Sequence, residues 1–277
     1  MKLFFLGIVV GIVFLWFSLQ GVEIQSVMSR LNTLNFSYLI PAVLLSVLGA
    51  FLRSVRLGIM LSPLSLISQK RLFPISCVGF LAVTLVPMRI GELVRPYLVG
   101  RETAISMTSA IAVIFVEKAL DLLTLGAMFC FAMWGNSISG ISWDSVVSLL
   151  LIVICLVGAL FVVQKNRDLR SKVVRVFLRV FPVRFKRSVE EMIERFFEGF
   201  RIIGSPWKVF YISLLSVLNW GLSGGMVIYC LFLFQNLSLP LSASFLVLVM
   251  TMLGISIPSA PGLVGNFQIG SVMALTS

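Results

Sequence analysis

The chain has 277 residues, of which 59% are hydrophobic and only 12% are charged. Soluble domains carry about 25% charged residues, so this composition excludes a water-soluble fold. The absence of histidine excludes Ser-His-Asp catalysis and histidine zinc sites. The formal net charge is +11, from 22 Lys and Arg against 11 Asp and Glu, and the position of that charge needs an explanation.

Apolar runs recur along the whole chain. A helix needs about 20 apolar residues to cross a bilayer core. Runs of suitable length lie at residues 3–22, 37–61, 105–134, 146–163 and 207–234, and less regular ones at 72–86 and 241–257. We predict an all-α, polytopic integral membrane helix bundle with about 6–8 membrane segments. Residues 1–277 form one transmembrane domain, and the end at Ser277 inside another apolar run is typical of a truncated C-terminus.

Positive charge is concentrated in one loop. Nine Lys and Arg but only one acid, Asp168, lie between Lys165 and Arg187. The positive-inside rule therefore predicts that loop 164–206 and the N-terminus are cytoplasmic. The stretch from Lys165 to Arg187 accounts for 9 − 1 = +8 of the net charge, so a nucleic-acid partner is not needed to explain it.

The same loop has helical periodicity. Apolar residues recur every three or four positions on both sides of Pro182, which predicts two amphipathic helices lying on anionic inner-leaflet lipids. Ser188 followed by Glu191 has the pattern of a capping box, which predicts the start of the second helix at that point.

Two segments are too broken for a continuous span. Lys70 and Arg101 both fall on the cytoplasmic side when spans are counted, so residues 72–86 should enter the membrane and return. Pro87 and Gly91 are the hinge of this re-entrant segment. A second hinge consists of Pro258, Pro261, Gly262 and Gly265. Two interrupted segments that enter from opposite faces indicate an inverted-repeat transporter.

Charged residues also occur inside the predicted spans. Glu117 and Asp121 are four residues apart and share a helix face, with Lys118 beside them. One interpretation is a structural ion pair with an arginine of another helix. The other is a proton- or cation-handling site, because mutual repulsion raises the pKa of one carboxylate.

Arginines are the second part of this charged set. Arg53 and Arg56 lie near the end of a predicted span, where snorkelling is one explanation. Arg89 and Arg95 lie at the turn of the re-entrant segment, and a guanidinium group suits a lipid phosphate. The predicted substrate-binding residues are Arg53, Arg56, Arg89, Glu92, Arg95, Glu117 and Asp121.

Together these motifs resemble a known family. The elements are Arg53-x-x-Arg56, Pro87-x-Arg89-x-Gly91-Glu92-x-x-Arg95, Glu117-Lys118-x-x-Asp121 and Pro258-x-x-Pro261-Gly262-x-x-Gly265. They are similar to the flippase-like membrane domain of the lysylphosphatidylglycerol synthase family. The resemblance implies a stand-alone member without the soluble synthase domain, in a prokaryotic cell (inner) membrane.

The function that the resemblance implies is translocation of a lipid. A phospholipid or polyprenyl-linked lipid would move between leaflets, with arginines on its phosphate and buried carboxylates on a cationic headgroup or proton. One alternative is an integral-membrane transferase that uses Glu92 or Asp121 as general base, and another is a membrane partner of a lipid-modifying enzyme. We predict no catalytic residues, no metal and no cofactor; the partners are a membrane lipid substrate and anionic inner-leaflet lipids.

Overall fold

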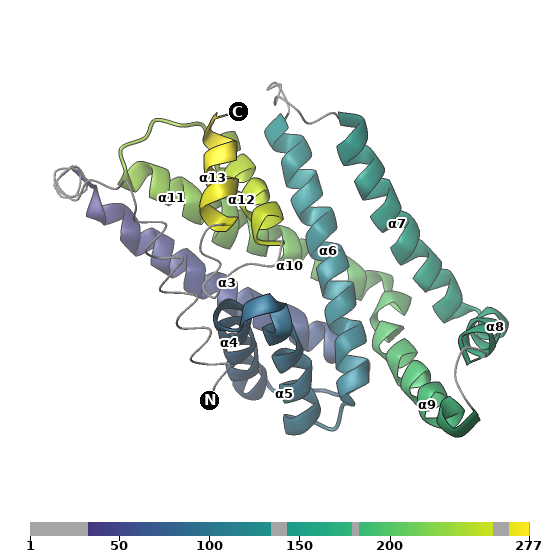
Figure 1. The fold of residues 1–277 in the computed structure, drawn as a ribbon. Coiled ribbons are helices and arrows are strands. Elements are labelled where there is room, and N and C mark those ends of the chain that lie inside the picture. The colour runs from purple at the N-terminus through teal and green to yellow at the C-terminus, as the bar shows by residue number, and fades with distance from the viewer. Residues whose placement is uncertain (1–32, 134–142, 179–182, 257–265, 277) are drawn as a thin grey trace.

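The computed structural model describes residues 33–133, 143–178, 183–256 and 266–276. These residues form helices and their connections, without a strand (Figure 1). The first half comprises η1 (Phe36–Tyr38), α3 (Leu39–Leu61), α4 (Gln69–Leu85), η2 (Pro87–Leu93), α5 (Val94–Glu102) and α6 (Met107–Met133). The second half comprises α7 (Trp143–Lys165), α8 (Arg167–Leu178), α9 (Val183–Gly199), η3 (Phe200–Gly204), α10 (Pro206–Trp220), the π-helical turn η4 (Gly221–Met226), α11 (Val227–Phe234), α12 (Leu241–Ser256) and α13 (Asn266–Thr276).

The described helices confirm the all-α membrane bundle. Two of them, Phe36–Leu61 and the continuous helix Pro206–Phe234, are long and apolar enough to cross a membrane. Helix α6 is 27 residues long and also has the length to cross, but three charged residues lie in its middle third. These helices match the predicted spans 37–61, 207–234 and 105–134, whereas the predicted span 3–22 lies outside the described residues.

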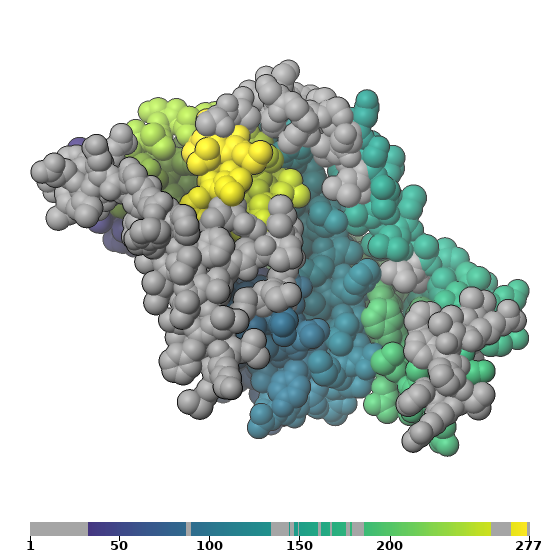
Figure 2. All heavy atoms as spheres, in the orientation of Figure 1, coloured from purple at the N-terminus to yellow at the C-terminus, as the bar shows by residue number. Residues whose placement is uncertain are grey.

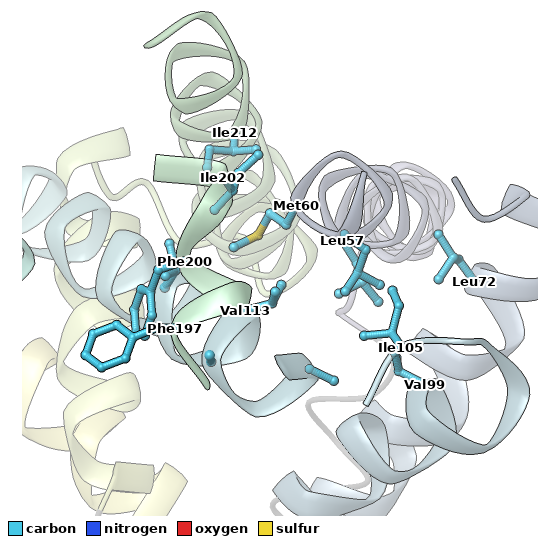
Figure 3. Packing of buried hydrophobic residues seen from close by; sticks show 14 of the residues in the cluster. Leu57, Met60, Leu72, Val99, Ile105, Val113, Phe197, Phe200, Ile202 and Ile212 are labelled. Atoms are coloured by element: carbon cyan, nitrogen blue, oxygen red, sulfur yellow. The ribbon is translucent and has the colours of Figure 1, made fainter. Parts of the chain in front are cut away.

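The main apolar core packs where α3 ends and α6 begins, and Figure 3 shows its residues from close by. It joins the end of α3, the start of α6 and the segment around η3, through buried residues such as Leu57, Met60, Val113, Phe200 and Ile202. The first residues of α4 and the last residues of α5 belong to the same cluster. Both ends of the predicted re-entrant segment therefore lie at the end of the bundle that also holds α8 and α9.

The chain reverses between α4 and α5, as the re-entrant prediction requires. The two helices pack closely, since a Cβ added at Gly79 of α4 would lie 2.8 Å from Cβ of Arg95 of α5. Pro87 is the first residue of η2, where its missing N–H does not interrupt a hydrogen bond. A Cβ at Gly91 would overlap the carbonyl of Ala82, so only glycine allows the turn to close on α4.

A second pair of helices, α12 and α13, packs at the other end of the bundle (Figure 1). A Cβ at Gly270 of α13 would lie 2.6 Å from the carbonyl oxygen of Met250 of α12. The predicted hinge between them, Pro258, Pro261, Gly262 and Gly265, lies outside the described residues. Both helix pairs reach the face of the molecule seen in Figure 2. The inverted repeat itself stays a prediction.

The basic segment contains two helices, as predicted, but two details differ. Helix α9 begins at Val183, so Ser188 lies inside the helix and the predicted capping-box start is wrong. Three good helix formers, Arg184, Lys186 and Arg187, follow Pro182 and no Gly or Pro lies between them and Ser188, which allows the earlier start. The apolar face of α9 also packs within the protein, because Phe197 is buried and the Ser109 hydroxyl of α6 donates to the backbone oxygen of Arg195 at 2.8 Å.

Candidate functional site

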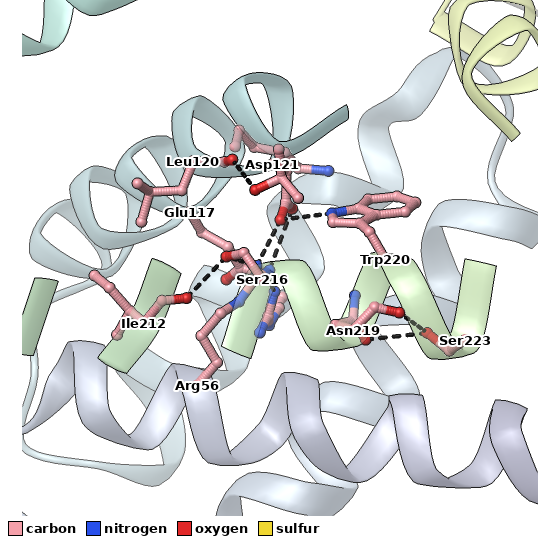
Figure 4. Close-up of polar contacts among 12 residues, drawn as sticks. Arg56, Glu117, Leu120, Asp121, Ile212, Ser216, Asn219, Trp220 and Ser223 are labelled. Carbon is pink, nitrogen blue, oxygen red and sulfur yellow. Dashed lines mark hydrogen bonds and ion pairs between the residues drawn. The ribbon is translucent and has the colours of Figure 1, made fainter. Parts of the chain in front are cut away.

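Arg56 of α3 lies at the centre of a buried polar cluster (Figure 4). Its side chain is only 1% exposed, so it does not snorkel to the surface. Nη1 donates to Asp121 Oδ1 at 2.5 Å and to Ser216 Oγ at 2.6 Å, and Nη2 donates to Glu117 Oε1 at 2.8 Å. Arg56 thereby connects α3 with α6 and α10.

Glu117 accepts from two arginines through a single oxygen. Its Oε1 receives Arg56 Nη2 at 2.8 Å and Arg95 Nη1 at 2.9 Å. Arg95 lies on α5, and the close approach of Gly79 leaves room for its side chain to extend towards α6. The shared oxygen thus connects the α4–α5 hairpin with α3.

Asp121 is held from two sides. Both of its oxygens accept from Arg56, and Oδ1 also accepts from the indole Nε1 of Trp220 at 2.9 Å. Of the two interpretations of these carboxylates, the structure shows the ion pair with an arginine of another helix. The alternative rested on repulsion between Glu117 and Asp121, which these cationic partners offset.

A cavity of about 440 Å³ lies beside this cluster, between α3, the α4–α5 hairpin, α6 and α10. Its wall includes three cationic and three anionic side chains: Arg53, Arg95 and Lys118, and Glu92, Glu117 and Asp121. Apolar residues of α4, among them Phe80 and Leu81, complete the wall. A cavity lined by opposite charges within a membrane bundle is the kind of place where polar groups cross lipid.

Three predicted residues remain. Arg53 and Glu92 lie at the cavity wall, and the side chain of Arg89 lies outside the described residues. Arg53 lies over the Phe80 ring, with Cζ 4.5 Å from the ring centroid. Glu92 of η2 lies 3.9 Å from Lys118 Nζ, measured from Oε1. The backbone of Arg89 forms part of η2, but its side chain lies outside the described part of the chain.

Sequence reasoning missed part of the α10 contribution to the site. Ser216 and Trp220 bond directly to the charged cluster, and Asn219 lines the cavity. These residues and Ser223 recur at three- to four-residue spacing along an otherwise apolar helix. Such a polar stripe on one face was the signal that could have identified them.

Several buried polar atoms at the cavity have no hydrogen-bond partner among the described residues. They include Nε and Nη2 of Arg95, Oε2 of Glu117 and Oγ of Ser76. Buried polar groups are normally satisfied, so a cluster of unsatisfied ones suits a bound polar molecule. No group of three or more Cys, Asp or Glu among the described residues is arranged to hold a metal ion.

Fold and site define a polytopic α-helical membrane protein with a charged cavity inside the bundle. The family model of the lysylphosphatidylglycerol synthase TM region matches residues 4–277, and the chain belongs to this family. It is therefore an integral membrane protein of a lipid-related family. No curated protein and no solved structure matches the chain.

Proposed function

We propose that the protein is a lipid translocase that moves a phospholipid or polyprenyl-linked lipid between the leaflets of the membrane. The charged headgroup enters the cavity between α3, the hairpin, α6 and α10, while the lipid chains stay in the bilayer. Arginines bind the phosphate, and Glu92, the cavity carboxylate outside the Arg56 cluster, receives a cationic headgroup or a coupling proton.

The observation that carries this proposal is the lack of hydrogen-bond acceptors on one side of the Arg95 guanidinium. Its side chain is 15% exposed, yet Nε and Nη2 are buried without a partner among the described residues. A buried guanidinium edge without an acceptor is costly, and a phosphate oxygen pair satisfies it with two parallel bonds. Arg53 adds a second positive charge at the wall of the same cavity.

The mixed charge of the cavity supports a headgroup rather than an inorganic anion. The three cationic side chains of the wall attract phosphate, and the three anionic ones lower the affinity for a ligand that carries only negative charge. A lipid whose headgroup combines phosphate with a cationic group satisfies both sets.

Leaflet exchange of a fluorescent phospholipid in vesicles containing the purified full chain tests the proposal. Arg95→Gln should abolish most of the exchange, because glutamine lacks the charge and the planar fork. Arg101→Gln is the matched control, since Arg101 lies on the same helix with a side chain that is 65% exposed. Exchange at the wild-type rate in Arg95→Gln vesicles would contradict the assignment of the cavity.

The alternative functions make different demands on the site. As general base of a transferase, Asp121 would have to gain and lose a proton, yet both its oxygens accept from Arg56 and one also from Trp220. This arrangement suits a fixed anion better than a base. Incubation of the purified protein with a lipid acceptor and an activated donor distinguishes the two, because a translocase forms no product.

A further inference from the structure

The guanidinium of Arg95 has two different edges in this site. Nη1 donates to Glu117 Oε1 at 2.9 Å, whereas Nε and Nη2 have no partner among the described residues. Nε and Nη2 form the side of the planar fork that binds two oxygens in parallel. One end of the guanidinium is therefore held by the protein, and the side edge is buried without an acceptor in the described part of the chain, in a residue that lines the cavity.

Glu117 is itself held in place. Its side chain is only 4% exposed, and Oε1 also accepts from Arg56 Nη2 at 2.8 Å. Arg56 in turn bonds to Asp121, which accepts from Trp220. The buried chain of contacts runs from α10 through α6 and α3 and ends at Arg95.

We propose that Glu117 is a positioning residue that acts through Arg95, and that the lipid phosphate is bound by the Nε–Nη2 edge of Arg95 together with the hydroxyl of Ser76. This inference rests on the proposed function and narrows the role of Glu117 within it. Glu117 orients the fork and does not contact the headgroup. The conformational freedom of a long arginine side chain is removed before the lipid arrives, which favours binding.

Ser76 belongs to this site on independent grounds. It lies on α4, the opposite arm of the hairpin from Arg95, and its side chain lines the same cavity. The residue is 8% exposed, and Oγ has no hydrogen-bond partner among the described residues. Buried hydroxyl groups are normally hydrogen-bonded, so the Oγ of Ser76, unpaired within the described ranges, suits a ligand oxygen as partner.

The competing role for Glu117 is direct contact with a cationic headgroup. Three short-chain probes separate the two roles: phosphatidic acid has the phosphate alone, phosphatidylethanolamine has phosphate and ammonium, and diacylglycerol has neither. Their affinities for the purified full chain in mild detergent are measured by calorimetry. The variants are Glu117→Gln, Glu117→Ala, Ser76→Ala and Arg95→Gln, with Arg101→Gln as control.

The positioning role predicts a specific pattern. Wild type and Arg101→Gln should prefer phosphatidic acid over diacylglycerol at least about tenfold, and Arg95→Gln should lose the preference. Glu117→Gln should bind both phosphate probes within about threefold of wild type, because its amide oxygen still accepts from Arg95 and Arg56. Glu117→Ala should weaken both probes equally, by about tenfold, and Ser76→Ala should weaken both by several-fold.

Other outcomes overturn the inference in distinguishable ways. If Glu117→Gln weakens phosphatidylethanolamine alone, Glu117 contacts the ammonium and the positioning role is wrong, while the proposed function stands. Wild-type affinity in Glu117→Ala also refutes positioning. If Glu117→Ala does not fold, the affinities of Glu117→Gln for phosphatidic acid and phosphatidylethanolamine still distinguish the positioning role from direct contact. Absence of any phosphate preference in wild type would refute the phosphate site and the inference together.

Discussion

Two regions of the molecule are rich in arginine, and they use it in opposite ways. In the cluster around Arg56, the arginine side chain is 1% exposed and its guanidinium bonds to two carboxylates and a hydroxyl. In the basic segment α8–α9, Arg187 has a side chain that is 93% exposed and lies 3.4 Å from Glu191. The first region contributes little to the net charge, whereas the stretch from Lys165 to Arg187, which includes α8 and the start of α9, holds nine bases and one acid.

The difference shows that position, and not residue type, decides what a charge does. Exposed ion pairs contribute about 0–1 kcal/mol, because water solvates both partners. A buried pair that loses one partner leaves an uncompensated charge in a medium of low dielectric, at a cost of about 3–5 kcal/mol. Substitutions of the same chemical kind in the two regions should therefore have very different effects.

The largest contrast is expected for paired arginine substitutions. Arg56→Met removes the shared partner of Glu117 and Asp121 and should lower the free energy of unfolding by about 3–5 kcal/mol. Arg175→Met, at an exposed position of α8, should change it by less than about 0.5 kcal/mol. Denaturation of both variants in detergent, followed by circular dichroism, measures the difference. Equal effects would mean that the buried cluster does not stabilise the bundle.

A glycine pair gives the next largest contrast. In Gly91→Ala the new Cβ would overlap the Ala82 carbonyl, and forcing the hairpin apart should cost about 1–3 kcal/mol. Gly204→Ala, in the segment after α9, introduces a Cβ with no atom within 4 Å and should be neutral. Thermal unfolding compares the two. A neutral Gly91→Ala would show that the α4–α5 turn does not need the close approach.

A smaller effect is expected at the tryptophan of the cluster. Trp220→Phe keeps an aromatic ring but removes the indole N–H that donates to Asp121 Oδ1. The free energy of unfolding should fall by only about 1–2 kcal/mol, because Arg56 still binds the carboxylate. Trp207→Phe on the same helix is the control, because Trp207 is 73% exposed. Denaturant midpoints of the two variants test the difference, and a neutral Trp220→Phe would remove the indole from the cluster.

The last contrast concerns the proposed contact of the basic segment with anionic inner-leaflet lipids. Lys172→Gln combined with Arg175→Gln removes two exposed charges of α8. Each charge near an anionic leaflet contributes about 1 kcal/mol. The double variant should therefore lose part of any stabilisation that anionic nanodiscs provide over neutral ones. An unchanged difference between the two lipid compositions would argue against contact of α8 with the leaflet.

The sequence predicted most helices because their signals are local. Apolar runs located α3, α6, α7 and the long helix formed by α10 and α11, and Pro87 and Gly91 located the reversal between α4 and α5. The start of α9 was predicted wrongly from Ser188, because a capping pattern is short and helix propensity upstream of it was favourable.

The charged residues of the site were also recognisable from the sequence, because charge inside an apolar span is costly and therefore conspicuous. Their pairing was not. Whether Arg56 snorkelled or bonded to Glu117 and Asp121 depended on how α3 crosses α6, and the contribution of Trp220 depended on how α10 lies against both helices. Contacts between helices far apart in the chain have no local sequence signal.

The sequence by itself determined a membrane protein with helical spans and a conspicuous set of charges, because hydropathy and charge act residue by residue. Tertiary structure decided which charges neutralise one another and which face the cavity. In the sequence, Glu117 and Arg95 are both single charges in apolar surroundings, and neither shows which partners it has. Only packing gave Glu117 two arginine partners through one oxygen and left the Nε–Nη2 edge of Arg95 without a partner among the described residues.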